Sequence, residues 1–298
     1  MKIKIGCDPE LFVKDAKTGE IISAHDLLPG TKVDPYKVTA GAVQVDGAAA
    51  EFNIDPSNSP AEFVRNIKTV MDQLKVMLKD NQFHIEPFVT FPKDYFTKLP
   101  ESVRELGCNP DWNAWTGQVN PAPEGDSTTL RTASGHLHIG WCEGMEPHST
   151  FHFEDCCSVV KQLDYYLGMT SLIWDKDPTR RQLYGKAGAF RPKPYGVEYR
   201  VLSNVWLKSQ RLQEWIWHVT QKAINDLSSG NNMWVKYGDY ARQIIDSNDI
   251  DWVNKKEALK VWQSLDISSP PTLIEETEVK KPVRKRKVAH HTYDEEAA

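Results

Sequence analysis

Four short segments of the chain have the alternation of a β-strand but carry ionisable side chains where apolar ones would suffice for packing. They are CDPELFV (7–13), VDGAAAEFN (45–53), SGHLHIGW (134–141) and GVEYRVLSN (196–204). Burying an unpaired charge is costly, so such groups normally pair, bind cations or line a wet site. The four segments together therefore predict a polyvalent cation and phosphate site, which indicates an enzyme.

Further elements follow from hydrophobic periodicity and from capping and turn signals. Ser59-Pro60-Ala61-Glu62 is a capping box that begins a helix running to about Asp80. Residues 2–13 alternate as one strand. Two long loops, rich in turn residues or basic residues, occupy 107–131 and 175–195. The remaining predictions are strands at 20–24, 42–53, 83–91, 134–141 and 196–203, and helices at 153–173, 209–228, 237–247 and 255–265.

Composition narrows the classes of function. With 298 residues, 40% hydrophobic and 26% charged, the chain has the content of an ordinary soluble protein with an ample core. The net charge of −5 argues against a general nucleic-acid binder. No apolar run approaches the roughly 18 residues that span a bilayer, and the N-terminus lacks a signal-peptide pattern. We therefore expect a cytoplasmic protein without a nucleic-acid or membrane partner. The five cysteines lack a CxxC pair, which favours reduced thiols.

The pattern of a folded chain ends near residue 268. Prolines, acidic runs and a basic run with little apolar content predict a disordered tail over 268–298. The basic run KKPVRKRK fits an anionic partner, but a solvated tail is the simpler interpretation. We accordingly expect one catalytic domain over 1–267, with C-terminal helices from about 209.

His136 and His138 are two positions apart on a predicted strand, so their imidazoles share one face. Imidazole is a good ligand for divalent transition metals, whereas magnesium prefers oxygen. An isolated pair of this kind is more often structural, bonded to backbone groups. Its place beside three acidic strand segments favours a functional role.

Glu198 and Arg200 share a strand face in the same way. One interpretation is a salt bridge on a solvated sheet face. The neighbouring loop, however, adds many cations, which suits a polyphosphate or another anionic substrate. These cations are Arg180, Arg181, Lys186, Arg191 and Lys193.

Three carboxylates complete the candidate set, namely Glu10, Asp46 and Glu51. Each alone reads as an ordinary exposed strand carboxylate. Together they must either repel one another or be bridged by cations. Several oxygen ligands with one or two histidines suit Mg²⁺ or Mn²⁺ that holds nucleotide phosphates.

The order of these motifs resembles a known superfamily. An acidic strand, D-G-x-x-x-E-F, R-x-x-x-G-H-x-H-x-G and G-V-E-Y-R occur in the order seen in the glutamine synthetase/glutamate–cysteine ligase superfamily. The closest resemblance is to its phage and bacterial carboxylate–amine ligase branch, over about residues 3–205. The resemblance implies an α+β fold, in which an antiparallel sheet funnel carries helices on its outer face. It also implies ATP at one end of the funnel and an amino-acid-like substrate at the other.

The resemblance further implies roles for individual residues. Arg200 matches the arginine that contacts the transferred phosphate, and Arg131 and Arg181 are expected to act beside it. Lys186, Arg180 and Arg191 are expected to bind the nucleotide. His136 is expected to support the site without being a ligand itself. The metal-binding positions of the family match Glu10, Asp46, Glu51, His138 and Glu198.

The implied reaction is an ATP- and Mg²⁺-dependent (or Mn²⁺-dependent) ligation through an acyl phosphate. The partner would be a small molecule or peptide with a carboxylate and an amine, and the resemblance leaves a homo-oligomer open. If the chain is phage-encoded, the compartment is the host cytoplasm. Two alternatives are a metal-dependent hydrolase, an amidase or phosphoesterase on the same cluster, and a non-catalytic scaffold protein. The hydrolase needs neither ATP nor the arginines, so the cationic loop counts against it.

Overall fold

The computed structural model describes residues 2–104, 111–121 and 128–273. Cys108 and the part of the predicted tail from residue 274 onward lie outside the described residues. The beginning of that predicted tail, 268–273, packs against the body of the protein. There the indole Nε1–H of Trp215 donates to Ser268 O at 2.9 Å.

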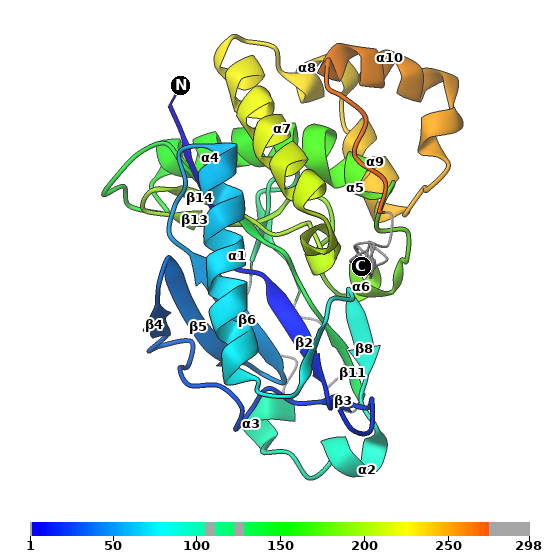
Figure 1. Ribbon diagram of the computed structural model, residues 1–298. Helices are drawn as coiled ribbons and strands as arrows, with labels where there is room; N and C mark the ends of the chain where they lie inside the picture. The colour runs from blue at the N-terminus through cyan, green and yellow to red at the C-terminus, as the bar shows by residue number, and fades with distance from the viewer. Residues whose placement is uncertain (1, 105–110, 122–127, 274–298) are drawn as a thin grey trace, which may run out of the picture.

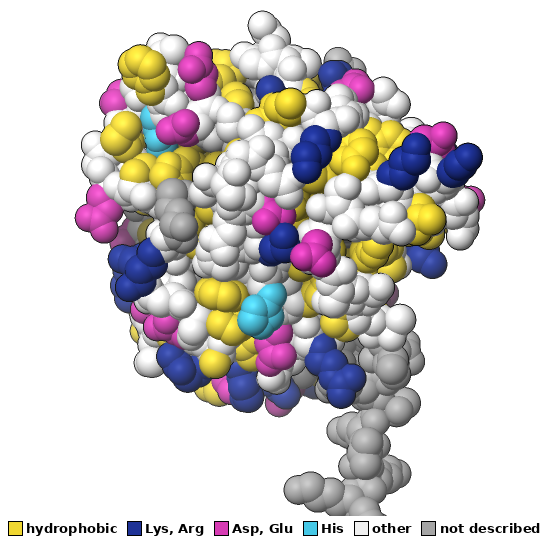
Figure 2. Space-filling view, turned by 90° about the horizontal axis from the view of Figure 1, so that it is seen from above, with side chains coloured by type: hydrophobic (Ala, Val, Ile, Leu, Met, Phe, Trp, Pro, Cys, Tyr) yellow, Lys and Arg dark blue, Asp and Glu magenta, His cyan; other side chains and the backbone are white. Residues whose placement is uncertain are grey.

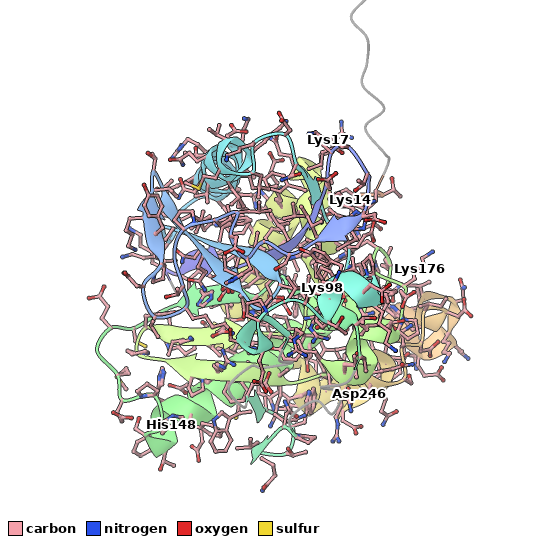
Figure 3. All side chains as sticks on the ribbon, turned by 90° about the horizontal axis from the view of Figure 1, so that it is seen from below. Lys14, Lys17, Lys98, His148, Lys176 and Asp246 are labelled. Atoms are coloured by element: carbon pink, nitrogen blue, oxygen red, sulfur yellow. The ribbon has the colours of Figure 1, made fainter. Side chains whose placement is uncertain are left out.

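Two antiparallel sheets form two facing layers at the centre of the molecule, and the view from below shows them separately (Figures 1 and 3). A short pair, β8 (Phe88–Thr90) and β11 (Leu130–Thr132), lies beside them. Sheet 1 has the strand order β1 (Lys4–Cys7), β12 (Leu137–Gly140), β14 (Gly196–Tyr199), β13 (Ala189–Lys193), β9 (Trp112–Asn113) and β10 (Gln118–Val119). Sheet 2 has the order β3 (Ile21–Ile22), β2 (Glu10–Lys14), β6 (Ala49–Ile54), β5 (Gly41–Asp46) and β4 (Tyr36–Val38), with β7 (Gln82–His84) also paired to β2.

The chain crosses from sheet 1 to sheet 2 at Asp8-Pro9. The prediction of a single strand over 2–13 is wrong, because β1 ends before this dipeptide and β2 begins after it. Proline has no N–H to donate to a ladder, so it interrupts the pairing. Its carbonyl accepts from Phe52 N–H, at 3.2 Å, on the sheet 2 side. The crossing leaves Asp8 in the seam between the two sheets.

The stretch predicted as one interrupted strand over 42–53 is a β-hairpin. β5 and β6 pair from Gly41↔Ile54 to Asp46↔Ala49. Gly47, in the turn, has φ +54°, a left-handed conformation that glycine adopts without a steric penalty. The alternation along β5 and β6 then directs Gln44 and Glu51 to the same face of sheet 2 as Glu10 on β2.

Helices cover the outer faces of the sheets (Figure 1). α1 (Pro60–Met77) packs on β5 and β6, α4 (Thr150–Leu163) packs on β13 and β14, and α7 (Gln210–Ser228) contacts both of these helices. This mixture of helices and antiparallel sheet confirms the α+β class, while the glutamine synthetase-type funnel stays a prediction. The shorter helices are α2 (Lys93–Phe96), α3 (Glu101–Arg104), α5 (Met169–Ser171), α6 (Thr179–Leu183), α8 (Met233–Tyr237), α9 (Tyr240–Asp246) and α10 (Lys256–Leu265).

The predicted start of α1 is confirmed, since Ser59 is its N-cap and its Oγ accepts from Glu62 N–H at 3.2 Å. Other helix predictions need correction. The helix predicted over 153–173 is interrupted by a π-helical turn, Asp164–Gly168, between α4 and α5. The helix predicted over 237–247 begins later, because Gly238 (φ +61°) separates α8 from α9. The predicted loop 175–195 contains α6 and β13.

The surface adds two observations. Among the described helices, none is both long enough and apolar enough to cross a membrane. The face seen from above carries Lys and Arg side chains intermixed with Asp, Glu and apolar ones (Figure 2). The carboxylates, histidines and arginines that the sequence predicts as a site lie mostly between the sheets and not on this face.

Candidate active site

Two rows of polar side chains run across the facing sheets. In sheet 1 the register places His138 opposite Glu198 and Glu198 opposite Arg191. In sheet 2 the register places Glu51 opposite both of its neighbours, Glu10 on β2 and Gln44 on β5. Because paired residues of neighbouring strands project to the same face, each row forms a continuous polar strip.

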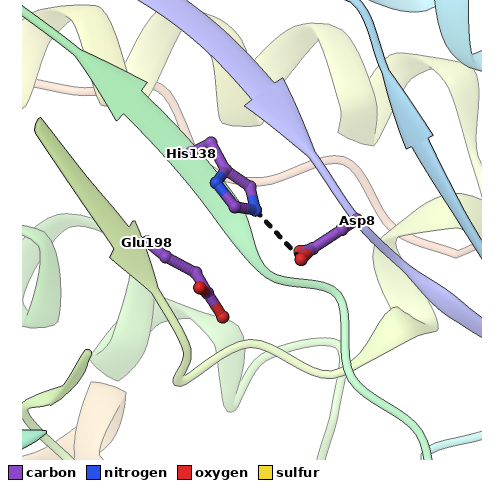
Figure 4. A group of neighbouring side chains, drawn as sticks. All are labelled: Asp8, His138 and Glu198. Carbon is purple, nitrogen blue, oxygen red and sulfur yellow. Dashed lines mark ion pairs between the residues drawn. The ribbon is translucent and has the colours of Figure 1, made fainter. Parts of the chain in front are cut away.

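Asp8 brings a fourth carboxylate, which lies between the rows. Its Oδ2 lies 3.0 Å from His138 Nε2. One ligand atom from each of Asp8, His138 and Glu198 lies within 4.8 Å of the others, and the three side chains converge on one space (Figure 4). The Asp8 Oδ1 is buried, lies 3.4 Å from His136 Nδ1 and accepts no hydrogen bond within the described structure. Two carboxylates and an imidazole form a donor set that suits Mn²⁺ or Mg²⁺.

Glu198 is 1% exposed, and cations surround it. Lys193 Nζ lies 2.7 Å from Oε2 and Arg191 Nη1 lies 3.7 Å from Oε1, while Arg200 Nη1 also contacts Oε1. The alternative of a solvated salt bridge is excluded by this burial. The group is a buried carboxylate within a cluster of positive charge.

Arg200 is oriented by three neighbours. Its Nε donates to Asp111 Oδ2 at 3.0 Å, and its Nη1 donates to Glu198. The Tyr184 ring lies against the guanidinium group, 5.2 Å from ring centroid to Cζ. The side chain is 2% exposed, yet it lines a cavity. Such an arrangement presents a pre-oriented cation to an anionic group.

The sheet 2 carboxylates repel one another in a dry environment. Burial, with Asp46 nearby, raises the pKa of Glu10 to about 7. Burial and the charges of Asp8, Asp46 and Glu10 raise the pKa of Glu51 well above its ordinary value. Lys32 Nζ lies 2.6 Å from Asp46 Oδ1 and offsets part of the negative charge. The cluster therefore holds protons at neutral pH unless cations replace them.

The two histidines differ in protonation. Burial and the Arg200 charge lower the pKa of His136 to about 4, so this imidazole is neutral near pH 7. Burial also opposes the charge on His138, but the Asp8 carboxylate outweighs it and raises the pKa of His138. The same two imidazoles hold the pKa of the Asp8 carboxyl well below its usual range despite its burial. The Asp8 carboxylate thus favours the protonated form of His138 when no metal ion is bound.

Two cavities meet at this cluster. The larger has a volume of about 790 Å³ and is lined by Lys2, Lys4, Trp141, Tyr195 and His138, among others. The second cavity has a volume of about 580 Å³, and both sheets line it. We call it the acidic cavity after the carboxylates of sheet 2 that line it, although arginines and lysines line it as well. Their shared wall consists of Asp8, Gln44 and Glu51.

Most of the site residues predicted from the sequence converge here. His138 and Glu51 line the larger cavity. Arg131 reaches the acidic cavity from β11, where it also donates to Thr128 O at 2.8 Å. The acidic cavity is lined by the predicted residues Glu10, Asp46, Glu51, Glu198, Arg131, Arg191 and Arg200.

Three predicted cations lie elsewhere, and neither of these two cavities includes them in its lining. Arg180, 1% exposed, donates to the carbonyls of Val201 and Leu202 at 2.8 and 2.9 Å and so ties α6 to the end of β14. Arg181 pairs with Asp175 at 2.9 Å behind sheet 1. Lys186 is exposed on the turn that follows α6. The expectation that these residues bind nucleotide or act on phosphate has no support from their positions.

Several residues that belong to the site were not predicted from the sequence. Asp8 lies within the CDPE segment, and the interruption at Pro9 was the available signal. Lys193 was noted only as one of the loop cations. Asp111 and Lys32 come from loops without periodicity, so no pattern in the sequence pointed to them.

Comparison with known proteins finds a similarity over the segment that contains the central strands of sheet 1. Residues 132–238 match the family model described as "Phage phiEco32-like COOH.NH2 ligase-type 2". A search of curated proteins found no match. The matched region includes His138 on β12, Glu198 on β14, and Arg200 directly after β14. It covers just over a third of the chain and excludes the sheet 2 carboxylates. Over these residues the chain is similar to a carboxylate–amine ligase family.

Proposed function

We propose that the protein is an ATP- and Mg²⁺- or Mn²⁺-dependent ligase that joins a carboxylate to an amine through an acyl phosphate. One observation carries the proposal: the convergence of Asp8, His138 and Glu198 directly beside Arg200, where two cavities meet. Phosphoryl transfer requires cations and arginines at one point, with room for a nucleotide on one side and an acceptor on the other.

The lining of each cavity suggests what it binds. The larger cavity combines Trp141 and Tyr195 with Lys2 and Lys4, which suits the base and phosphates of a nucleotide. The acidic cavity contains Arg131, Arg191 and Arg200 as well as carboxylates. We infer that the substrate carboxylate lies there against the arginines, and that its amine partner approaches the carboxylate side.

Asp8, His138 and Glu198 would hold the cation, and Glu10 and Glu51, which are paired in register in the sheet 2 row, are the candidates for a second one. A bound divalent cation would neutralise charge on the phosphate oxygens. The substrate carboxylate oxygen attacks the γ-phosphorus of ATP, and ADP leaves. The amine nitrogen then attacks the acyl carbon, phosphate leaves, and the nitrogen loses a proton. Arg200 contributes by stabilising the phosphoryl oxygens in both steps.

The proposal is tested by measuring product masses after incubation with ATP, Mg²⁺, and pooled amino acids and short peptides. Amide formation with one ADP and one phosphate released per bond is expected, together with loss of turnover in Asp8→Asn and Glu198→Gln. Glu86→Gln, which removes a surface partner of Lys208, is the matched control. Hydrolysis of amides or phosphoesters without ATP would instead support the hydrolase. Absence of magnesium-dependent nucleotide binding would refute the ligase.

A further inference from the structure

The geometry of Arg200 depends on a hairpin that is remote in sequence. Asp111, which accepts from Arg200 Nε at 3.0 Å, begins the β9–β10 hairpin (111–120). Its other oxygen accepts from Asn120 Nδ2 at 2.8 Å, which joins the two ends of the hairpin. Movement of this hairpin relative to β14 would therefore separate Asp111 from Arg200.

The hairpin is attached to sheet 1 along one edge. β9 pairs with β13 at two positions, Asn113↔Ala189 and Trp112↔Phe190, and next to this pairing Ala114 N–H donates to Gly188 O at 2.8 Å and Asn113 Nδ2 donates to Ala187 O at 3.1 Å. A further tie comes from Trp115, in the hairpin turn, whose indole Nε1–H donates to Asp164 Oδ2 at 2.6 Å. The hairpin is thus tethered to a carboxylate on the back of the sheet.

The second oxygen of Asp164 holds the strand that carries the site. Its Oδ1 accepts from the Tyr199 hydroxyl at 2.8 Å. Tyr199 stands between Glu198 and Arg200 on the chain, so its side chain points to the opposite face from theirs. Asp164 has no exposed surface and begins the π-helical turn. In that turn, a Cβ on Gly168 would lie only 2.6 Å from the Tyr199 hydroxyl oxygen.

We propose that Asp164 is a positioning residue for Arg200. One buried carboxylate holds both the hairpin that carries Asp111 and Tyr199, the last residue of β14 and the residue before Arg200, so it sets the separation of that ion pair from behind the sheet. The inference deepens the proposed function and rests on it only for the statement that Arg200 contacts the transferred phosphate.

The first test follows the Arg200 Nε–H resonance by NMR in protein labelled with ¹⁵N-arginine, with the signal assigned by its loss in Arg200→Lys. In Asp164→Asn we expect this resonance to shift and to exchange faster with solvent, because the amide can accept from only one of the two donors. Asp72→Asn is the control, because Asp72 forms an exposed ion pair with Lys68 on α1 and does not hold the hairpin. An Arg200 signal unchanged in Asp164→Asn overturns the proposal.

Trp115→Phe keeps an aromatic ring but removes the indole N–H together with part of the bulk of the indole, and it serves if Asp164→Asn fails to fold. We expect the same change in the Arg200 signal. A folded Trp115→Phe protein with an unaltered signal would also overturn the proposal.

The second test measures turnover per folded protein. We expect kcat to fall about 10- to 100-fold in Asp164→Asn, with nucleotide affinity unchanged, since small displacements of a positioned group cost rates of that order. The double variant Asp111→Asn/Asp164→Asn should be no slower than Asp111→Asn alone, whereas a merely structural role predicts independent losses. If the wild-type protein ligates nothing, the proposed function fails, while the NMR test still decides whether Asp164 positions Arg200.

Discussion

Asp8 Oδ2 lies 3.0 Å from His138 Nε2, and this contact joins the seam between the two sheets to the central strands of sheet 1. The aspartate is available there because Pro9 interrupts the ladder and the chain changes sheets. The Asp8 carboxylate favours the protonated form of His138 when no metal ion is bound, and the contact places two ligand atoms on the same side of Glu198.

The first prediction concerns cation binding by this group. Asp8→Asn and His138→Gln should each weaken Mn²⁺ binding by more than about tenfold. Loss of a residue that only holds a metal ligand in place typically costs about tenfold or more in affinity, and loss of a ligand itself should cost more. Titration followed by electron paramagnetic resonance measures the free ion directly. Glu143→Gln, an exposed carboxylate at the larger cavity, should leave the affinity unchanged. Equal weakening in all three variants would show that the ion binds by general surface charge.

The second prediction concerns protons released by cation binding. Burial, with Asp46 nearby, raises the pKa of Glu10 to about 7, and the pKa of Glu51 is raised well above its usual range. A divalent cation must displace these protons if it binds the sheet 2 carboxylates, so its affinity should increase as the pH rises through 7. Calorimetry in buffers of different ionisation enthalpy counts the protons. Release should decrease in Glu10→Gln, and a count of zero in the wild-type protein would place the cation elsewhere.

The third prediction concerns the stability supplied by Glu198. Glu198→Gln leaves Lys193, Arg191 and Arg200 without their shared carboxylate, at a position with 1% exposure. Removal of one partner from a buried charge cluster typically costs about 3–5 kcal/mol of unfolding free energy. Urea denaturation measures the loss of unfolding free energy. Glu86→Gln removes a half-exposed pair with Lys208 and should cost at most about 1 kcal/mol. Equal costs would mean that the Glu198 cluster is screened by water.

The fourth prediction concerns the glycine behind sheet 1. Gly168→Ala should destabilise the protein by about 1–3 kcal/mol, because the new Cβ would lie 2.6 Å from the Tyr199 hydroxyl oxygen and 2.7 Å from Ile245 Cδ1. Gly140→Ala is the control, since its nearest new contact is Tyr195 O at 3.5 Å, an ordinary separation. Thermal denaturation distinguishes the two. A tolerated Gly168→Ala would mean that the π-helical turn moves freely.

The fifth prediction concerns pH and Asp164. Burial, with a contribution from Asp246, raises the pKa of Asp164 to about 7 although Trp115 and Tyr199 donate to it. The folded protein therefore keeps a proton that an unfolded chain releases near pH 4. The stability that this group supplies is complete below about pH 4 and is lost as the pH rises to about 7.

Asp164→Asn lacks this titration, so the wild-type advantage in unfolding free energy should decrease between about pH 4 and 7, by up to a few kcal/mol. Urea denaturation with a chelator present measures both proteins at each pH. Glu10 titrates in both, so its effect cancels in the difference. A constant difference across this range would show that Asp164 is already ionised at low pH.

Local patterns in the sequence determined which side chains share a face. Glu198 and Arg200 lie two positions apart and both line the acidic cavity, as strand alternation requires. The N-cap at Ser59 is likewise confirmed, although the Glu62 carboxylate accepts from Asn58 N–H and not from Ser59 N–H as a capping box requires. Such features depend on neighbours within a few residues, so the sequence alone suffices to predict them.

Tertiary structure decided which of these groups meet. Asp111 and Arg200 are 89 positions apart, and no period in the chain relates them. The arginines of α6 carry the same charge as Arg191, yet their backbone and Asp175 contacts remove them from the cavity. Asp8 joined the cluster because a proline turned the chain from one sheet to the other. Residue type and spacing thus determined the chemistry available, whereas long-range strand pairing and burial selected the groups that form the site.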